Sequence, residues 1–190
     1  MAGGTVSNRD LPTTYRPETR WPLKNRFAMT SSAIPTDPYW MLRRSPPTPE
    51  GELCRCDSLE AIMLRDSLGD NPLYCVACNG EVAPERIGFD AQLAEDIAFW
   101  RSVHASLYHL WLDSGEYEEW AKQRLSDPKG QVHVRGRNLV AKLNDRITAY
   151  YWWFHDADDG VPDQCPICHC ALSERGDLNF QRCETCFVLI

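Results

Sequence analysis

The sequence predicts an α+β protein in which a central three-helix segment with an aromatic strand is flanked by two zinc-binding modules. Cysteine pairs at metal-binding spacing occur both before and after the predicted helical segment. Within the middle, apolar residues recur every three or four positions, which is the period of an amphipathic helix. An aromatic and β-branched run at residues 147–154 then predicts a strand.

The overall composition is that of a globular protein without a membrane segment. Of 190 residues, 43% are hydrophobic and 25% are charged, close to the average for folded domains. The chain has no apolar run of about 18 residues, and its N-terminus lacks a basic region followed by an apolar run. We therefore expect a cytoplasmic protein without a membrane partner, in which nine reduced cysteines serve metal or redox chemistry.

The charge balance is acidic, with a net charge of −7. Residues 1–50 carry +3, residues 51–90 carry −5, residues 91–160 carry −3 and residues 161–190 carry −2. Nonspecific binding of nucleic acid needs a positive surface that neutralises phosphates. A nucleic-acid role would therefore need a local basic patch or the basic N-terminal segment.

The first predicted region, residues 1–50, is rich in proline. It holds eight of the thirteen prolines, and proline fixes φ and removes a backbone donor. We expect an extended or partly disordered segment, which either packs in places onto the body or binds a partner. Its aromatic side chains Trp21, Phe27, Tyr39 and Trp40 could provide the contacts with the body.

Residues 51–89 form the predicted first zinc module. Cys54 and Cys56 make a C-x-C pair, and Cys75 and Cys78 make a C-x-x-C pair after eighteen intervening residues. Asn79-Gly80 follows as a turn dipeptide. The intervening residues 58–69 are interpreted as a short helix. The alternatives are a half-site, or thiols that simply lie in the core.

Residues 90–160 form the predicted helical segment with its strand. Asp90 is the predicted N-cap of a long helix that ends at Asp113-Ser114-Gly115. A second helix ends at Ser126-Asp127-Pro128, and a third is marked by Leu139, Val140, Leu143 and Ile147. In the strand, alternation predicts that Tyr150, Trp152 and Phe154 lie on one side, with Tyr151, Trp153 and His155 on the other. His104 and His109 are expected to be packing or surface residues.

Residues 161–190 form the predicted zinc ribbon. Cys165 and Cys168 make one C-x-x-C pair, and Cys183 and Cys186 make another after fourteen residues. Zinc accepts four thiolates in a tetrahedron, and two such turns supply them. Four cysteines also close the site to substrate. The sequence thus predicts two structural zinc ions and no catalytic residue, although it does not exclude an enzyme.

Cys170 is the ninth cysteine, outside both predicted sets. It could replace Cys168 as a ligand or be a spare thiol, and the C-x-x-C pairing favours Cys168. His169 is expected to be exposed rather than ligating. Residues 165–169 also match the C-x-x-C-H haem-attachment motif, which is disfavoured because no export signal precedes it and because Cys183 and Cys186 would be unexplained.

Several segments resemble a known family. LWLDSGEYEEWAKQRLSDP, AYYWWF, CPIC and FQRCETCFVLI are similar to an uncharacterised bacterial family described as zinc-ribbon proteins and candidate nucleic-acid binders, over roughly residues 75–188. The resemblance implies a C-terminal ribbon and an earlier cysteine-rich element. His169 and Cys170 replace the small residues usual there, and no basic residue follows Phe187, which weakens the nucleic-acid role.

The function that the sequence favours is a non-enzymatic adaptor or regulatory protein that binds a protein partner. Its acidic charge disfavours the first alternative, a nucleic-acid-binding ribbon protein. The second alternative is a thiol-redox protein that uses Cys170 or a C-x-x-C pair.

Overall fold

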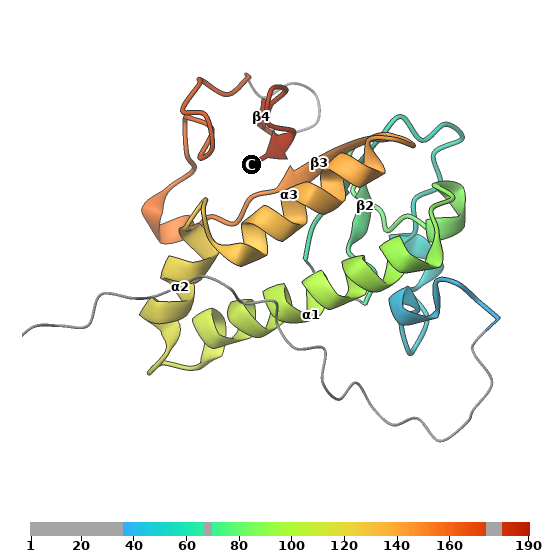
Figure 1. Cartoon of the computed structure of the whole chain (residues 1–190), viewed down its shortest axis with the longest axis horizontal. Coiled ribbons are helices and arrows are strands. Elements are labelled where there is room, and N and C mark those ends of the chain that lie inside the picture. Colours follow the sequence, from blue (N-terminus) through green and yellow to red (C-terminus); the bar gives the residue numbers. More distant parts are fainter. Residues whose placement is uncertain (1–35, 67–69, 174–179) are drawn as a thin grey trace, which may run out of the picture. The chain divides into compact units, whose positions relative to one another are not determined.

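The described residues, 36–66, 70–173 and 180–190 of this computed structural model, form a five-stranded mixed sheet and three α-helices (Figure 1). Two of the helices pack on one face of the sheet, and the other packs mainly on a neighbouring helix. The helices are α1 (Ala91–Asp113), α2 (Glu118–Ser126) and α3 (Gln131–Leu143). Short 3-10 turns are η1 (Trp40–Leu42), η2 (Glu50–Glu52), η3 (Pro84–Arg86) and η4 (Ala157–Asp159). The predicted α+β class is confirmed. The predicted behaviour of residues 1–35, including Trp21 and Phe27, lies outside the described residues.

The strands are β1 (Ala61–Leu64), β2 (Leu73–Cys75), β3 (Thr148–Trp152), β4 (Arg182–Cys183) and β5 (Val188–Leu189). Their order across the sheet is β2-β1-β3-β5-β4. The inner strands β1, β3 and β5 are parallel, and the edge strands β2 and β4 are antiparallel to their neighbours. Both edge strands end at a cysteine. The two cysteine-rich modules are therefore built on opposite edges of one sheet.

The prediction of a helix at residues 58–69 is wrong, because β1 occupies the middle of that stretch. Ile62 and Leu64 point toward the helices, whereas Met63 packs on the opposite face of the sheet. Both faces of β1 are therefore buried, and its backbone is paired with β2 on one side and β3 on the other. When a short strand is buried on both faces, its residues are all apolar, and the sequence has no hydrophobic periodicity that distinguishes it from a helix.

The helices are confirmed, with one change of boundary. The Asp90 side chain accepts a hydrogen bond from the Leu93 backbone N–H at 2.8 Å and so caps α1. The third helix begins directly after the Lys129-Gly130 turn and ends at Leu143, before Ile147. Asn144 ends it by donating to Ala149 O at 2.9 Å and accepting from Ala149 N at 3.0 Å. These two bonds turn the chain directly into β3.

The aromatic strand divides its side chains between the two faces of the sheet. Tyr151 and Trp153 belong to the main core beneath the helices, and Tyr150 and Trp152 lie in a second cluster on the other face. The predicted alternation therefore holds within β3. Phe154 departs from it, because it lies beyond the end of the strand and packs on α1, with its ring 4.9 Å from that of Trp111.

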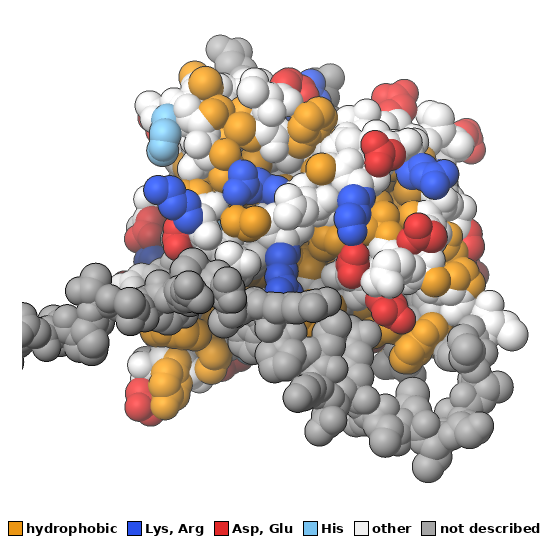
Figure 2. Space-filling view, in the orientation of Figure 1, with side chains coloured by type: hydrophobic (Ala, Val, Ile, Leu, Met, Phe, Trp, Pro, Cys, Tyr) orange, Lys and Arg blue, Asp and Glu red, His pale blue; other side chains and the backbone are white. Residues whose placement is uncertain are grey.

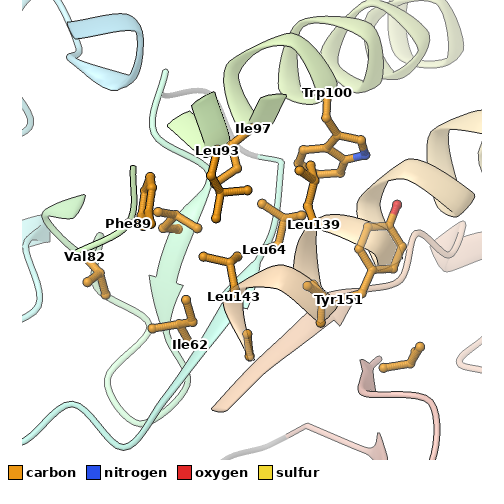
Figure 3. Packing of buried hydrophobic residues seen from close by; sticks show 14 of the residues in the cluster. Ile62, Leu64, Val82, Phe89, Leu93, Ile97, Trp100, Leu139, Leu143 and Tyr151 are labelled. Carbon is orange, nitrogen blue, oxygen red and sulfur yellow. The ribbon is translucent and has the colours of Figure 1, made fainter. Parts of the chain in front are cut away.

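The main core lies between the sheet and α1 and α3. Figure 3 shows Ile62, Leu64 and Tyr151 of the sheet directed at Leu93, Ile97, Trp100, Leu139 and Leu143 of the helices. The buried imidazole of His133 is paired through both of its nitrogens. His133 contacts the Tyr151 hydroxyl at 3.0 Å through Nδ1 and Leu125 O at 2.7 Å through Nε2. Because a carbonyl only accepts, Nε2 carries the proton and Nδ1 accepts from Tyr151.

The segment that precedes the first cysteines packs on the helical layer. The Tyr39 hydroxyl donates to Phe89 O at 2.7 Å, and Leu42 is buried beside it. Trp40 remains partly exposed. On the face shown in Figure 2, Lys and Arg side chains are interspersed with Asp and Glu side chains. None of the described helices is long and apolar enough to cross a membrane.

Candidate metal centres

The structure brings the eight predicted cysteines together in two groups of four, and within each group every Sγ lies within 4.8 Å of the others. Cys56 and Cys75 Sγ are 4.0 Å apart, and Cys168 and Cys183 Sγ are 3.6 Å apart. Zinc–sulfur bonds of about 2.3 Å in a tetrahedron separate the sulfurs by about 3.8 Å. The geometry and the all-thiol donor set therefore fit a structural metal ion, and zinc in particular. The first centre comprises Cys54, Cys56, Cys75 and Cys78, and the second comprises Cys165, Cys168, Cys183 and Cys186.

The first centre joins a loop to the end of β2. The Cys54 N–H donates to Glu81 O at 2.8 Å, which fixes the C-x-C arm against the segment that leaves the Cys75–Cys78 turn. Gly80 lies where these two segments meet. A Cβ there would be 2.7 Å from the Cys54 nitrogen, so a side chain would push the two halves of the centre apart.

The second centre joins two hairpins. Cys165 and Cys168 lie in the turn of a short hairpin closed by the bridge between Gln164 and Ala171. Cys183 ends β4, and Cys186 lies in the turn that leads to β5. The two hairpins are tied together where the Ser173 N–H donates to Arg182 O at 3.0 Å.

The three C-x-x-C turns share one backbone conformation. The residue after the second cysteine has a positive φ in each, with values of 57° at Asn79, 59° at His169 and 51° at Phe187. These are the positive-φ residues other than glycine in the described part of the chain. Asparagine adopts this region readily, whereas histidine and phenylalanine do so at a cost of about 1–2 kcal/mol. His169 is thus a turn residue, and it is exposed as predicted.

Cys170 occupies the place that Gly80 has in the first centre. The Cys165 N–H donates to Cys170 O at 2.9 Å, just as the Cys75 N–H donates to Gly80 O at 2.9 Å. The Cys170 thiol is exposed and lies outside the group of four sulfurs. Its backbone therefore closes the turn, and the geometry favours Cys168 as the ligand.

The electrostatics of each group favour the binding of a cation. The Cys170 backbone N–H, assisted by neighbouring thiols, lowers the pKa of Cys168 to about 6. Burial opposes ionisation at Cys54, but hydrogen bonds from the Cys56 backbone and neighbouring thiols lower its pKa to about 7. Burial raises the pKa of Cys183 and of Cys186. One thiol in each centre therefore ionises readily, and a bound divalent cation would allow the others to follow.

Arg86 in η3 is a functional residue that the sequence analysis missed. Its Nη1 donates to Cys54 O at 2.9 Å and lies 3.3 Å from Cys54 Sγ, and its Nη2 donates to Cys56 O at 2.6 Å. The guanidinium therefore holds the short C-x-C arm and places positive charge beside a thiolate. No motif connects Arg86 with these cysteines, because it lies thirty residues beyond Cys56.

The two histidines of α1 have separate environments. His104 is buried, and its Nδ1 lies 2.8 Å from Asp66 Oδ2. His109 is exposed, with Nδ1 3.9 Å from an Asp113 carboxylate oxygen. The expectation that both are packing or surface residues is confirmed. Neither belongs to a metal-binding group in the described part of the chain.

No family model, curated protein or solved structure matches this chain. The resemblance to the bacterial zinc-ribbon family therefore stays a prediction, and the functional argument depends on the two centres and the surfaces around them.

Proposed function

We propose that the chain is a zinc-binding, non-enzymatic adaptor or regulatory protein that acts through protein–protein contacts. The observation that carries the proposal is the pair of four-sulfur groups at opposite edges of one sheet. Four cysteine ligands fill the tetrahedron around a zinc ion, so neither centre would keep a position for water or substrate. The ions would then serve the structure that displays a binding surface.

Zinc would stabilise the parts of the fold that have little other support. Strands β4 and β5 contain two residues each, and the C-x-C arm is a loop that ends at the first centre. Structural zinc contributes on the order of 10 kcal/mol to the folding of small modules whose ligands cannot assemble without it. We therefore expect both edges of the sheet to depend on the metal more strongly than the helices do.

The charge of the chain supports a protein partner. Residues 36–190 contain fifteen Lys and Arg residues against twenty-five Asp and Glu residues. Four thiolates around a divalent ion add a net charge of about −2 at each centre. An acidic body repels a phosphate backbone, and it suits a partner protein that has basic groups at its interface.

One observation favours a second candidate, the binding of single-stranded nucleic acid. On the sheet face opposite the main core, the Arg65 guanidinium lies 4.7 Å from the Trp152 ring centroid and 5.9 Å from that of Tyr74. None of the described helices contributes a buried residue to the cluster on this face. Aromatic side chains on a sheet can stack bases, and arginine can add cation–π contacts.

A titration separates the two candidates. The zinc-loaded full chain is titrated with single- and double-stranded DNA and RNA at about 50 and 200 mM salt, because binding to phosphates weakens steeply over that range. The adaptor function predicts no submicromolar binding in any of these titrations. Submicromolar, salt-sensitive binding that is lost in Trp152→Ala would contradict it and assign the aromatic sheet face to nucleic acid.

A further inference from the structure

Helix α2 carries an exposed aromatic stripe that consists of Tyr117, Trp120 and Arg124, which we name the α2 stripe. Tyr117 immediately precedes the helix and is 50% exposed, and Trp120 is 47% exposed. The Arg124 guanidinium lies 5.4 Å from the Trp120 ring centroid. Spacings of three and four residues place the three side chains on one face of the helix.

The α2 stripe is not what fixes α2 to the rest of the fold. Ala121 and Leu125, each about 100° further round the helix than Trp120 and Arg124, are fully buried. Lys122 adds ion pairs with Asp156 at 2.7 Å and Asp159 at 2.9 Å. Packing and charge therefore hold the helix, and two large aromatic side chains beside these contacts remain half exposed. Exposed aromatic side chains gathered in this way mark interaction sites.

The surroundings of the α2 stripe are acidic. Residues 112–120 contain four carboxylates and neither lysine nor arginine, and the acidic residues are Asp113, Glu116, Glu118 and Glu119. Among the described ion pairs, none involves these glutamates, and Asp113 meets only the exposed His109. Figure 2 shows hydrophobic side chains beside acidic ones at the lower left, where Figure 1 places the junction of α1 and α2. Glu118 and Glu119 lie in the first turn of α2, where their negative charge interacts favourably with the helix dipole.

We propose that the α2 stripe and its acidic rim, which consists of Asp113, Glu116, Glu118 and Glu119, are the docking surface for a protein partner that presents an apolar face bordered by lysine and arginine. The proposal rests on the adaptor function proposed above. Tryptophan, tyrosine and arginine are the residues that dominate the energetics of protein interfaces. The contact of Arg124 with Trp120 orders the indole before binding, which lowers the entropic cost of docking.

Electrostatic complementarity distinguishes between the partners that could bind the α2 stripe. The four carboxylates would repel the phosphates of a nucleic acid, even though the aromatic rings could stack on bases. A second copy docked through the same surface would place like charges opposite one another. A basic protein surface is complementary in both its apolar and its charged parts.

The test uses a synthetic helix-forming peptide with leucine along one face and lysine along the other, fluorescently labelled and titrated with the zinc-loaded full chain. We expect binding that weakens as salt rises, and a loss of at least about tenfold in Trp120→Ala. Trp40→Ala is the matched control, because Trp40 is 44% exposed on η1, and its affinity should not change. Glu116→Lys tests the rim independently and should weaken binding without removing any apolar contact.

Equal affinity for Trp120→Ala, Glu116→Lys and the unaltered chain would overturn the docking surface. Circular dichroism of each variant shows whether its fold is intact, and Tyr117→Ser replaces Trp120→Ala if that variant does not fold. Concentration-dependent dimerisation that disappears in Trp120→Ala would identify a second copy as the occupant and would also overturn the proposal. Nucleic-acid binding that survives Trp120→Ala, by contrast, would contradict the adaptor function itself.

Discussion

The substitution Gly136→Ala adds one methyl group at the closest approach between α3 and the sheet. The new Cβ would lie 2.2 Å from Tyr151 Cε2 and 2.9 Å from its Cδ2 and Cζ atoms. Tyr151 is fully buried in the central strand β3, and its hydroxyl is bonded to His133. Its ring packs edge-on against Trp100 at 5.9 Å. The ring therefore has no free space into which it could retreat.

The size of the effect follows from two opposing contributions. Replacing glycine by alanine inside a helix stabilises it by about 1 kcal/mol. Forcing an extra methyl group into a packed core costs about 1–3 kcal/mol, and more where neighbours cannot move. Because three ring atoms are closer than van der Waals contact, we expect the upper part of that range. The free energy of unfolding should fall by about 2 kcal/mol.

Urea unfolding of the zinc-loaded chain, followed by far-ultraviolet circular dichroism, measures this loss. Gly51→Ala is the matched control, because an added Cβ at Gly51 meets no atom within 4 Å, and its stability should change little. In a Tyr151→Leu background the ring is absent, so Gly136→Ala should cost less there. An increase in stability, or the same loss in both backgrounds, would refute the packing of α3 against Tyr151.

Three further predictions concern single side chains. Burial lowers the pKa of His133 from 6.5 to about 4, so the folded state resists protonation of this side chain. About 3 kcal/mol of the free energy of unfolding, present above pH 6.5, should therefore be lost as the pH falls to 4. Urea unfolding between pH 6.5 and 4 should show a larger loss of stability in the unaltered chain than in His133→Gln. The same pH dependence in both proteins would contradict this prediction. Asp90→Ala should lower the free energy of unfolding by about 1 kcal/mol, because α1 loses its N-cap, and an unchanged urea midpoint would be the contrary result. Arg86→Met should accelerate the transfer of one zinc ion to a chelator and leave the other unchanged, and unaltered kinetics for both would argue against the role of the guanidinium.

The parts of the fold that the sequence predicts are those with local signals. Helix α1 has a capping aspartate, a long apolar period and a glycine-containing stop, and each of these acts within a few residues of the chain. The cysteine pairs are similar, because a C-x-x-C turn presents two sulfurs whatever surrounds it. The helix signals predicted the correct element, and the cysteine spacings predicted the correct grouping of the sulfurs.

The parts that could not be predicted depend on partners distant in sequence. β1 is a strand because β3 pairs with it across an intervening stretch of more than eighty residues. Arg86 reaches Cys54 only because η3 lies beside the C-x-C arm. His133 is buried with both ring nitrogens paired because Tyr151 and Leu125 lie beside them, and this burial keeps the ring neutral. Nothing in the composition near these residues indicates those contacts.

The central claim is that two closed zinc centres support the edges of one sheet, and zinc content measures it most directly. Elemental analysis of the purified full chain should find two zinc ions per chain, and Cys183→Ser should retain one while the second centre loses its order. Cys170→Ser, which leaves both sets of four sulfurs intact, should retain two. One zinc ion or none in the unaltered chain, or two in Cys183→Ser, would contradict the account.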